Sequence, residues 1–471
     1  MADTLYDVAI IGSGPAGYTA AIRAGQLGLK AALIEKDPYL GGTCLHVGCI
    51  PTKSLLFNAE VYDHVKDGVE LGIENLGGAT LNWGTIQKRK KGIIDKHAKG
   101  LQFLMKKNKV TVIEGYGKLT GPAKSGVLTV EVEGKNGKST VTARNVVLST
   151  GSVARMLPGL KADDRILTNI EVLSLDSIPK SLIVIGSGAV GVEFASIYKS
   201  FGAEVTILEM LPRYVPVEDE EISKELARVY RKRGINGFVN AKVETVERTK
   251  DGVAVTFSVD GKSQKIEADK VLIAIGRAPR TENIGLEKTK VEVERGFVKI
   301  NQFMQTAEPG IYAIGDIAMG YPQLAHAGAM EGIVAVTHIA GKPAKPINKL
   351  RIPGATYCHP EIGSVGLTEA KAKELGYDVK VGKFPFTANS RASIVESHDG
   401  FVKIVTDKKY GEILGVHIIG PTATELIAES VVALEMECTA EDLANIIHAH
   451  PTLSEAMLDA ANAVFGMPIN T

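Results

Sequence analysis

Close to the start of the chain stands the stretch Val8-Ala9-Ile10-Ile11-Gly12-Ser13-Gly14-Pro15-Ala16-Gly17. Its four apolar residues predict a buried strand, and its glycine turn opens a helix that we expect to run to about Gly28. A second apolar strand over 31–34 then ends at Glu35. This order of strand, glycine turn, helix, strand and carboxylate predicts a βαβ unit that binds a dinucleotide.

The same pattern recurs in the middle of the chain, as Ile183-Val184-Ile185-Gly186-Ser187-Gly188-Ala189-Val190-Gly191. A predicted helix and strand follow, and the strand ends at Glu209. Glu35 and Glu209 each come 23 residues after the first glycine of their motif. Two ordinary glycine turns are the alternative, but strand, helix and distal carboxylate agree in both copies. The repeat therefore predicts two nucleotide sites.

Each part of the motif has a physical role. The first glycine permits the tight turn, the second lets a pyrophosphate approach the backbone, and the third lets helix and strand pack closely. The helix N-terminus then offers unpaired N–H groups and a partial positive charge to the phosphates. Glu35 and Glu209 are placed to accept hydrogen bonds from a ribose, and a carboxylate there would repel a 2′-phosphate. Glu209 thus favours NAD over NADP, although Arg213 stands close by in the sequence.

A cysteine pair follows the first motif, within Gly41-Gly42-Thr43-Cys44-Leu45-His46-Val47-Gly48-Cys49-Ile50-Pro51-Thr52-Lys53. A regular helix would raise Cys49 about 7.5 Å above Cys44, which exceeds the usual Cα separation of a disulfide. The backbone must therefore distort, and Gly48 supplies the freedom to do so. Lys53 lies one helical turn beyond Cys49 and can favour a thiolate. The pair predicts a redox-active dithiol rather than two unrelated buried thiols.

Composition limits the class of protein. The chain has 471 residues, of which 45% are apolar and 50 are glycine, and this suits a large α/β protein of about three domains. Acidic and basic residues number 54 each, which argues against nucleic acid or a membrane surface as the main partner. Four cysteines are too few for a disulfide framework. We expect no signal or transit peptide ahead of Val8, and hence a soluble, cytoplasmic protein.

Two dinucleotide sites and a dithiol together predict an electron relay. Thiols do not exchange hydride with nicotinamide at useful rates, so a flavin is needed between them. Because the dithiol follows the first glycine motif, we expect FAD at that motif and NAD at the second.

Over nearly its whole length the chain resembles the FAD-dependent pyridine nucleotide-disulfide oxidoreductases, and within them the members that oxidise dihydrolipoyl groups. The motifs that carry this resemblance are Gly12 to Gly17, Gly41 to Lys53, Thr150-Gly151-Ser152, Gly186 to Gly191, Ile275-Gly276-Arg277, Ala313-Ile314-Gly315-Asp316 and His450-Pro451-Thr452-Leu453-Ser454-Glu455. The resemblance implies an α/β fold with two Rossmann-like domains, for FAD and NAD, a central domain that completes the FAD site, and a C-terminal α+β dimerisation domain. The implied domains are 1–150, 151–275, 276–349 and 350–471.

The resemblance also implies roles for the reactive residues. Cys44 would be the interchange thiol that meets the substrate, and Cys49 the thiol in charge-transfer contact with the flavin. Lys53 would lie beside the isoalloxazine, with Glu193 as its carboxylate partner. A buried lysine without such a carboxylate would tend to lose its charge, so the pairing is physically sensible.

His450 and Glu455 form a second reactive pair near the C-terminus. A dithiol substrate must lose a proton before it attacks, and imidazole titrates in the useful range, while Glu455 can orient the ring. The resemblance implies that His450 reaches the dithiol of the other subunit, and hence a homodimer. The alternatives are a metal-binding fragment that includes His448, or an ordinary loop histidine.

The expected cofactor contacts complete the site, and no metal ligand is expected among them. The FAD contacts are Gly12, Gly14, Ala16, Gly17, Glu35, Gly42, Thr43, Lys53, Gly117, Thr150, Gly151, Ser152, Asp316, Gln323, Leu324, Ala325 and His326. The NAD contacts are Gly186, Gly188, Val190, Gly191, Glu193, Glu209, Val243 and Gly276.

The implied reaction is the oxidation of protein-bound dihydrolipoyl groups to lipoyl groups with NAD⁺ as acceptor, within a 2-oxo acid dehydrogenase or glycine cleavage complex. Glutathione or mercuric reduction is the nearest alternative. It calls for basic residues in place of Glu209, or for a second cysteine pair near the C-terminus, and the sequence has neither. A scaffold role within a multienzyme complex is an alternative of another class, and the intact set of reactive residues argues against it.

Further patterns predict structure. We expect hairpins over 127–144 and 253–268, strands over 402–406 and 413–418, and helices over 422–437, 439–447 and 453–464. A basic run could face an anionic partner such as an acidic carrier, and the alternative that we favour is the solvated face of a long helix. Its members are Lys88, Arg89, Lys90, Lys91, Lys96, Lys99, Lys106, Lys107 and Lys109.

Overall fold

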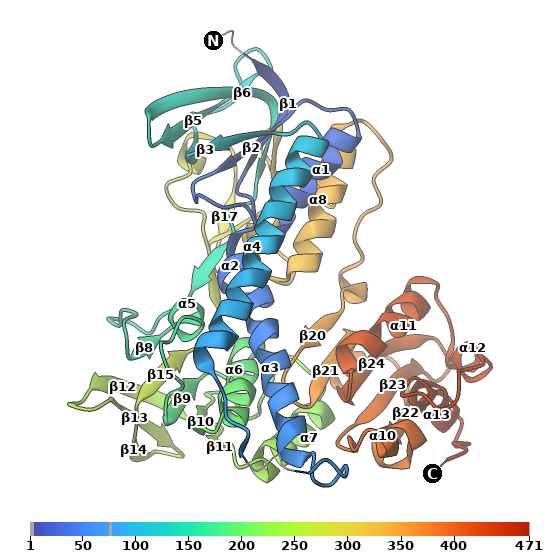
Figure 1. Ribbon diagram of the computed structural model, residues 1–471. Coiled ribbons are helices and arrows are strands. Elements are labelled where there is room, and N and C mark those ends of the chain that lie inside the picture. The colour runs from blue at the N-terminus through green and yellow to red at the C-terminus, as the bar shows by residue number, and fades with distance from the viewer. Residues whose placement is uncertain (1–3, 75–77, 471) are drawn as a thin grey trace. The chain divides into compact units, whose positions relative to one another are not determined.

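The computed structural model describes residues 4–74 and 78–470 (Figure 1). The chain folds into two compact units, and each is assembled from three separate stretches of sequence. Unit 1 takes its described residues from 1–54, 84–155 and 277–347, and unit 2 from 55–83, 156–276 and 348–471. The domain boundaries expected from the sequence remain predictions.

Unit 1 is built on one sheet. Its strands are β1 (Leu5–Ile11), β2 (Ala31–Glu35), β3 (Thr111–Glu114), β4 (Tyr116–Leu119), β5 (Leu128–Gly134), β6 (Gly137–Leu148) and β19 (Ile311–Ala313). Their order is β3-β2-β1-β6-β5-β4, and β19 pairs in parallel with β6. Strands β1, β2, β3 and β6 are also parallel, whereas β4 and β5 extend the sheet in antiparallel fashion. The hairpin predicted over 127–144 is confirmed as β5 and β6.

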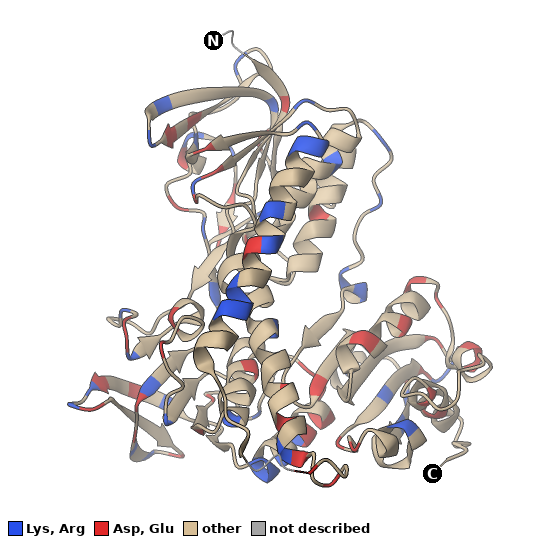
Figure 2. Ribbon diagram, viewed as in Figure 1, with Lys and Arg blue, Asp and Glu red and all other residues tan. Residues whose placement is uncertain are grey.

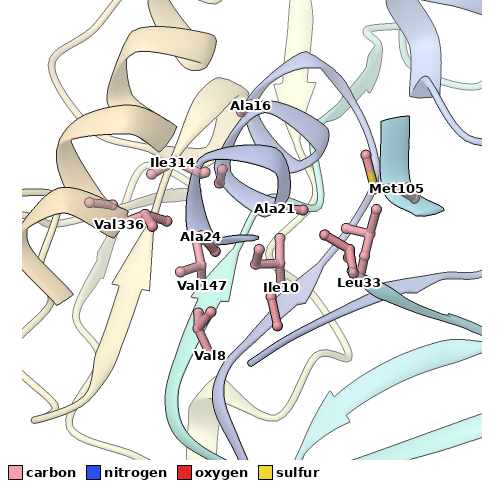
Figure 3. Packing of buried hydrophobic residues seen from close by; sticks show 14 of the residues in the cluster. Val8, Ile10, Ala16, Ala21, Ala24, Leu33, Met105, Val147, Ile314 and Val336 are labelled. Carbon is pink, nitrogen blue, oxygen red and sulfur yellow. The ribbon is translucent and has the colours of Figure 1, made fainter. Parts of the chain in front are cut away.

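The central strands of unit 1 are apolar on both faces, because both faces of the sheet are covered. Side chains alternate along a strand, so Val8 and Ile10 of β1 enter one core, whereas Ala9 and Ile11 enter the other. Figure 3 shows the first core, in which Val8, Ile10 and other strand residues pack against side chains from the helices. All four residues are at most 4% exposed.

Helices cover one face of this sheet. They are α1 (Pro15–Gln26), α2 (Gly42–Val47), the start of α3 (Cys49–Asp67), α4 (Trp83–Lys107) from its second residue onward, and α8 (Ala325–Ile339). Helices α1 and α8 lie side by side (Figure 1). Their approach is close, because a Cβ on Gly332 would lie only 2.7 Å from Ala16 O. The short elements are β7 (Ser152–Ala154), β16 (Arg277–Pro279), β17 (Val293–Glu294), β18 (Phe297–Val298), η2 (Leu286–Lys288) and η3 (Gly315–Ile317).

Unit 2 contains a second parallel sheet, in the order β11 (Asn236–Phe238), β10 (Glu204–Leu208), β9 (Ser181–Ile185), β15 (Lys270–Ile273) and β8 (Ile166–Leu167). Helices α5 (Asn169–Val172), α6 (Ala189–Ser200) and α7 (Glu220–Lys232) accompany it. An antiparallel sheet of β12 (Lys242–Arg248), β13 (Val253–Val259) and β14 (Lys262–Ala268) shares a core with this sheet and confirms the second hairpin. The units β1-α1-β2 and β9-α6-β10 confirm the predicted repeat.

The last part of unit 2 forms a third, antiparallel sheet with helices. Its order is β20 (Gly354–Thr356), β21 (Glu361–Gly366), β24 (Ile413–Gly420), β23 (Phe401–Asp407) and β22 (Val379–Pro385). Helices α11 (Ala423–Glu435), α12 (Ala440–Ala444) and α13 (Glu455–Val464) share its core. The short helices are η4 (Lys349–Arg351), α9 (Glu369–Glu374), η5 (Phe386–Ala388) and α10 (Ser390–Ile394).

One predicted helix, 439–447, is too long. Thr439 and Asp442 form a capping box that starts α12, but the helix ends at Ala444. The Asn445 side chain donates to Glu441 O at 2.9 Å, which is the local competition for backbone groups that favours a helix end. In the part of the chain that the structure describes, no helix has the length and apolar character of a membrane span.

Candidate functional site

The first glycine motif forms the turn between β1 and α1. Gly12 has a φ of +102°, and a Cβ there would lie 2.3 Å from Ser149 O. A Cβ on Gly17 would lie 1.9 Å from Gly12 O, so helix and strand meet there without room for a side chain. Gly14 differs, because no atom lies within 4 Å of its Cβ position and no side chain caps α1. The helix N-terminus therefore faces a space that suits a pyrophosphate.

The second motif repeats this geometry in unit 2. A Cβ on Gly186, whose φ is +100°, would lie 2.5 Å from Ala274 O, and one on Gly191 would lie 1.9 Å from Gly186 O. Gly188 has open space at its Cβ position, and no side chain caps α6. Both motifs thus leave a side-chain-sized space over a helix N-terminus, which fits a dinucleotide in each unit.

The two distal carboxylates hold their own glycine turns. Oε2 of Glu35 accepts from Ser13 N at 2.8 Å and from Ser13 Oγ at 2.6 Å, and Oε1 accepts from Asp37 N at 2.9 Å. Glu209 repeats the pattern with Ser187 N and Oγ, both at 2.7 Å, and with the N–H of the second residue after it, at 2.8 Å. A carboxylate has about four acceptor positions, so each retains capacity for a ribose hydroxyl. Sequence reasoning missed the serines, whose signal was their place between the first two glycines of both copies.

A cavity of about 370 Å³ lies beside Glu35 in unit 1. Leu40, Met105 and Val112 supply apolar walls, and Asp37 and Glu114 add two further carboxylates. Its size falls within the range of small-molecule sites. Glu35, the carboxylate expected to bind a ribose, is thus part of the cavity lining.

The two cysteines lie on different helices, as the predicted distortion requires. Helix α2 ends at Val47 and α3 begins at Cys49, while Gly48 between them has φ −145° and ψ −118°. A Cβ on Gly48 would lie 2.9 Å from Thr43 O and 3.3 Å from Cys44 Cα. A side chain at Gly48 would therefore obstruct the approach of the two helices.

Cys44 and Cys49 are both free cysteines in this structure. The hydrogen bond to the Cys49 side chain is the largest of the causes that raise the pKa of Cys44, and burial and the charge of Cys49 add to it. Lys53 acts in the opposite direction. In the reduced pair, Cys44 is therefore the sulfur that keeps its proton.

Cys44 lines a cavity of about 200 Å³ in unit 1. The remaining lining residues come from the glycine turn, α1, α2, α3 and α4, and are Pro15, Tyr18, Gly41, Leu45, Ile50, His97, Gly100, Leu101 and Leu104. Burial raises the pKa of Tyr18, and the two thiols beside it raise it further. Sequence reasoning missed Tyr18 and the α4 residues, because no local pattern connects them to the dithiol.

A polar cluster forms where the Gly315-Asp316 motif meets β7. Ser152 Oγ donates to Asp316 Oδ2, and Gln323 Nε2 donates to Asp316 O at 3.1 Å. Arg277 donates to Ser152 Oγ at 2.6 Å and to Ser152 O at 2.9 Å. Burial lowers the pKa of Arg277, and the charges of Asp316 and Cys49 act against that decrease. Three expected FAD contacts thus lie together, and Arg277, to which the motif gave no role, joins them.

The other expected FAD contacts lie in unit 1. A Cβ on Gly42 would lie 2.8 Å from Gly14 Cα, and Gly117 packs against Ile11 and Ile34. Thr150 Oγ1 donates to Arg280 O at 2.5 Å. The rest occupy the N-terminus of α2, the loop before β7 and the start of α8, and are Thr43, Gly151, Leu324, Ala325 and His326.

The expected NAD contacts lie in unit 2. Glu193 is buried on α6, and its Oε1 accepts from Tyr357 N at 2.9 Å. Gly276 has a φ of +103° with open space at its Cβ position, and Val243 lies on β12. Because Lys53 belongs to unit 1 and Glu193 to unit 2, their pairing stays a prediction.

The C-terminal pair is assembled as predicted. Nδ1 of His450 lies 2.9 Å from Glu455 Oε1, and Thr452 N donates to Glu455 Oε2 at 2.8 Å. Burial acts to raise the pKa of Glu455, but the hydrogen bonds from Thr452 and His450 outweigh burial and lower it. The His450 side chain is 70% exposed, so its Nε2 is available to a substrate. His448 instead has its own partner, Glu429 Oε1, at 2.8 Å.

Comparison with known proteins gives matches along almost the whole chain. The family model described as pyridine nucleotide-disulphide oxidoreductase matches residues 6–332, and the model of that family's dimerisation domain matches residues 352–461. Dihydrolipoyl dehydrogenase of Bacillus subtilis is 45% identical, with 99% of each chain covered. The mitochondrial dihydrolipoyl dehydrogenase of Pisum sativum is 41% identical over 98% of this chain and 92% of its own length.

Solved structures agree with this similarity. The crystal structure of LpdA from Mycobacterium tuberculosis matches with a TM-score of 0.89 at 30% identity, covering 98% of this chain and 99% of the other. The flavoprotein disulfide reductase RclA from Escherichia coli, solved as a Cu(II) complex, matches with a TM-score of 0.86 at 26% identity and the same coverage.

Proposed function

Because this chain belongs to the pyridine nucleotide-disulphide oxidoreductase family, we propose that it works as a dihydrolipoyl dehydrogenase, oxidising protein-bound dihydrolipoyl groups with NAD⁺ as acceptor. Its cofactors are FAD and NAD. One observation carries the proposal above the others: Cys44 on α2 lines a cavity and Cys49 begins the next helix, in a chain 45% identical over its length to such an enzyme.

The dithiol chemistry begins with the oxidised pair. His450 of the partner subunit takes a proton from one substrate thiol at Nε2, and Glu455 holds the imidazolium that forms. The substrate thiolate attacks Sγ of Cys44, and Cys49 leaves as a thiolate. The second substrate thiol loses its proton to solvent, and its sulfur attacks the substrate sulfur of this mixed disulfide, which closes the lipoyl ring. Cys44 is released and takes the proton held by the His450 imidazolium, while Cys49 remains a thiolate. Two electrons and two protons thereby leave the substrate, and both cysteines are reduced.

The reduced pair must return its electrons. FAD, when bound, transfers the electron pair from the dithiol to NAD⁺. We assign Cys49 to the flavin side, as the family resemblance implies, and Cys44, which lines the cavity, to the substrate side. Lys53 and Glu193 are proposed as a charge pair beside the flavin, and Asp316 is proposed to hold the ribityl chain. Glu209 is proposed to select NAD by repelling the 2′-phosphate of NADP.

The assembly is a homodimer, since the chain contains the dimerisation domain of the family. We propose that His450 acts across this dimer on the dithiol of the other subunit. The lipoyl group is proposed to be supplied by a carrier domain of a 2-oxo acid dehydrogenase or glycine cleavage complex. A cytoplasmic location is proposed as well, because four cysteines in 471 residues are too few for the disulfide framework of a secreted protein.

Steady-state kinetics test the function directly. The purified dimer is given dihydrolipoamide with NAD⁺ or NADP⁺, and NADH or NADPH formation is followed by absorbance. In reverse, lipoamide is compared with glutathione disulfide. We expect fast, NAD-selective turnover of the lipoyl substrates. Turnover of glutathione disulfide with NADPH alone would keep the dithiol and flavin but overturn the substrate assignment and the role of Glu209.

A further inference from the structure

Helix α4 concentrates positive charge, and Figure 2 shows lysine and arginine along its length. It contains eight lysines and arginines and a single acidic residue, Asp95, in a chain of zero formal net charge. Lys90 is buried, and burial lowers its pKa to about 8. Lys91 pairs with Asp95 at 2.8 Å. The remaining six are exposed, and they are Lys88, Arg89, Lys96, Lys99, Lys106 and Lys107.

Such a distribution is unfavourable for the helix alone. Like charges three or four residues apart, such as Lys96 and Lys99, destabilise a helix by about 0.2–0.5 kcal/mol each. Solubility does not require this excess of positive charge, because a surface that mixes both signs of charge is also soluble. Within the described ranges 4–74 and 78–470, no carboxylate lies within ion-pair distance of Lys96, Lys99 or Lys107. The charge is therefore available to a partner.

The same helix forms one wall of the cavity at Cys44, through His97, Gly100, Leu101 and Leu104. Gly100 is exposed, and no atom lies within 4 Å of its Cβ position, so this part of the wall has no side chain. A thin substrate arm meets no obstruction there.

A stripe of α4 borders this wall. Lys96, Gly100, Phe103 and Lys107 follow one another at intervals of four, three and four residues, which places them in one row along the helix. Phe103 is 63% exposed, and both lysines are exposed. The row therefore presents an apolar ring between two cations, directly beside the glycine that lines the cavity.

We propose that this row, Lys96–Phe103–Lys107, is the docking surface for an acidic protein domain that carries the dihydrolipoyl group. The proposal rests on the function given above and names the chemistry of the substrate carrier. A lipoyl group tethered to a protein can reach Cys44 only if the carrier comes to rest beside the cavity. An apolar centre with charge around it is the usual composition of such a contact.

The dimensions and the charge both favour a protein carrier. The row extends from Lys96 to Lys107, about 16 Å at roughly 1.5 Å per residue, which lies within the width of a small domain. Positive charge beside the cavity would accelerate encounter with an acidic carrier and would weaken as salt is added. Free dihydrolipoamide is uncharged and gains nothing from the row.

Charge reversal tests the surface. The double variant Lys96→Glu/Lys107→Glu is compared with wild type and with Lys288→Glu, a matched control that reverses an exposed lysine of unit 1 on η2. Each holoenzyme dimer receives two substrates, free dihydrolipoamide and a recombinant acidic lipoylated domain in reduced form. kcat/KM is measured at low and at high ionic strength, and the size of the dimer is measured by sedimentation.

For the double variant at low salt, we expect kcat/KM with the lipoylated domain to fall about tenfold, the range over which rim charges change association. Added salt should remove this difference in kcat/KM between the double variant and wild type. Turnover of free dihydrolipoamide should stay at the wild-type value. A second variant, Phe103→Ala, should lower kcat/KM with the domain by an amount that salt does not change. The Lys288→Glu control should behave as wild type.

Other outcomes overturn the proposal in different ways. Wild-type kinetics of the double variant with the lipoylated domain would remove the docking surface and leave the proposed function intact. Equal loss with free dihydrolipoamide would show that the lysines act on the cavity itself. Dissociation of the dimer would assign the row to contact with a second copy of the chain. Failure of the wild-type enzyme with both substrates would instead overturn the function on which the proposal rests.

Discussion

At the scale of single residues, the two thiols of the site differ in their surroundings. Cys44 lines a cavity and keeps its proton through the hydrogen bond to Cys49, whereas Cys49 begins α3. Cys44 is therefore proposed to meet the substrate, and Cys49 to pass the electron pair onward. Because the two sulfurs have different proposed roles, the loss of each should have different consequences.

Replacement of Cys49 should stop catalysis without removing the cofactor. In Cys49→Ser no disulfide can form, so lipoamide turnover and the long-wavelength absorption of the two-electron-reduced enzyme should both disappear, while FAD stays bound. Absorption spectra and turnover measure this. Cys438→Ser is the matched control, because Cys438 is a thiol outside the site and its loss should leave both signals unchanged. Lipoamide turnover at the wild-type rate in Cys49→Ser would refute the relay.

The two histidine–carboxylate contacts of unit 2 provide a comparison at the same scale. His450–Glu455 and His448–Glu429 have nearly equal distances, 2.9 and 2.8 Å, but only the first is proposed to act on substrate. Glu455→Gln removes the charge that holds the imidazolium, so kcat should fall by about 10²-fold or more. Glu429→Gln should retain wild-type kcat. Equal effects of the two changes would mean that Glu455 only supports the fold.

At the scale of secondary structure, each glycine turn contains one glycine that close packing requires and another that leaves space for a ligand. A Cβ on Gly191 would lie 1.9 Å from a carbonyl oxygen, whereas one on Gly188 would meet no atom within 4 Å. Gly188→Val should therefore leave the unfolding midpoint nearly unchanged and raise the KM for NAD⁺ at least tenfold. Gly191→Val should lower the unfolding midpoint clearly. Kinetics and thermal unfolding distinguish the two, and a normal KM in Gly188→Val would exclude pyrophosphate binding at that turn.

Elements of unit 2 are also joined by a buried lysine. Lys403 of β23 lies 2.9 Å from Asp219, 2.8 Å from Glu221 and 2.7 Å from Glu369, and its side chain is 2% exposed. Burial acts to lower the pKa of Lys403, but the three carboxylates outweigh it and raise the pKa. Burial acts to raise the pKa of Asp219 and Glu221, but hydrogen bonds from lysines and nearby positive charge outweigh it and lower both. Hydrogen bonds from lysines are the largest causes of the lowered pKa of Glu369. The cluster connects α7 and α9 to the third sheet.

Loss of this lysine should destabilise the protein in a pH-dependent way. Carboxyl groups whose pKa is lowered by folding stabilise the protein above their unfolded pKa of about 4, and that stabilisation is lost as pH falls through the folded pKa. Lys403→Met should therefore lower the free energy of unfolding by about 3–5 kcal/mol at neutral pH, and by less in acid. Denaturant unfolding measures this. Lys383→Met, which breaks an exposed pair with Glu221, should cost at most about 1 kcal/mol.

At the scale of the whole molecule, features set by neighbouring residues could be predicted from the sequence. The glycine motifs, the distortion at Gly48 and the His450–Glu455 contact all arise within short stretches, where spacing and residue type determine geometry. Tyr18 beside Cys44 and the Lys403 cluster could not be predicted, because they depend on packing between segments far apart in the chain. Helix α12 was overestimated because Asn445 competes for a backbone carbonyl, a choice that apolar periodicity does not reveal.

The assembly of unit 1 from three separate stretches of sequence has a consequence for its synthesis on the ribosome. Strand β19 and helix α8, which complete the sheet and the core around Val8 and Ile10, come from residues 311–339. The core around the first strand is therefore complete only after about 340 residues have been translated, which takes roughly 17 to 68 seconds at about 5–20 residues per second. During that interval the core around Val8 and Ile10 lacks the side chains that α8 contributes. We therefore expect unit 1 to reach its folded state only after α8 has left the ribosome.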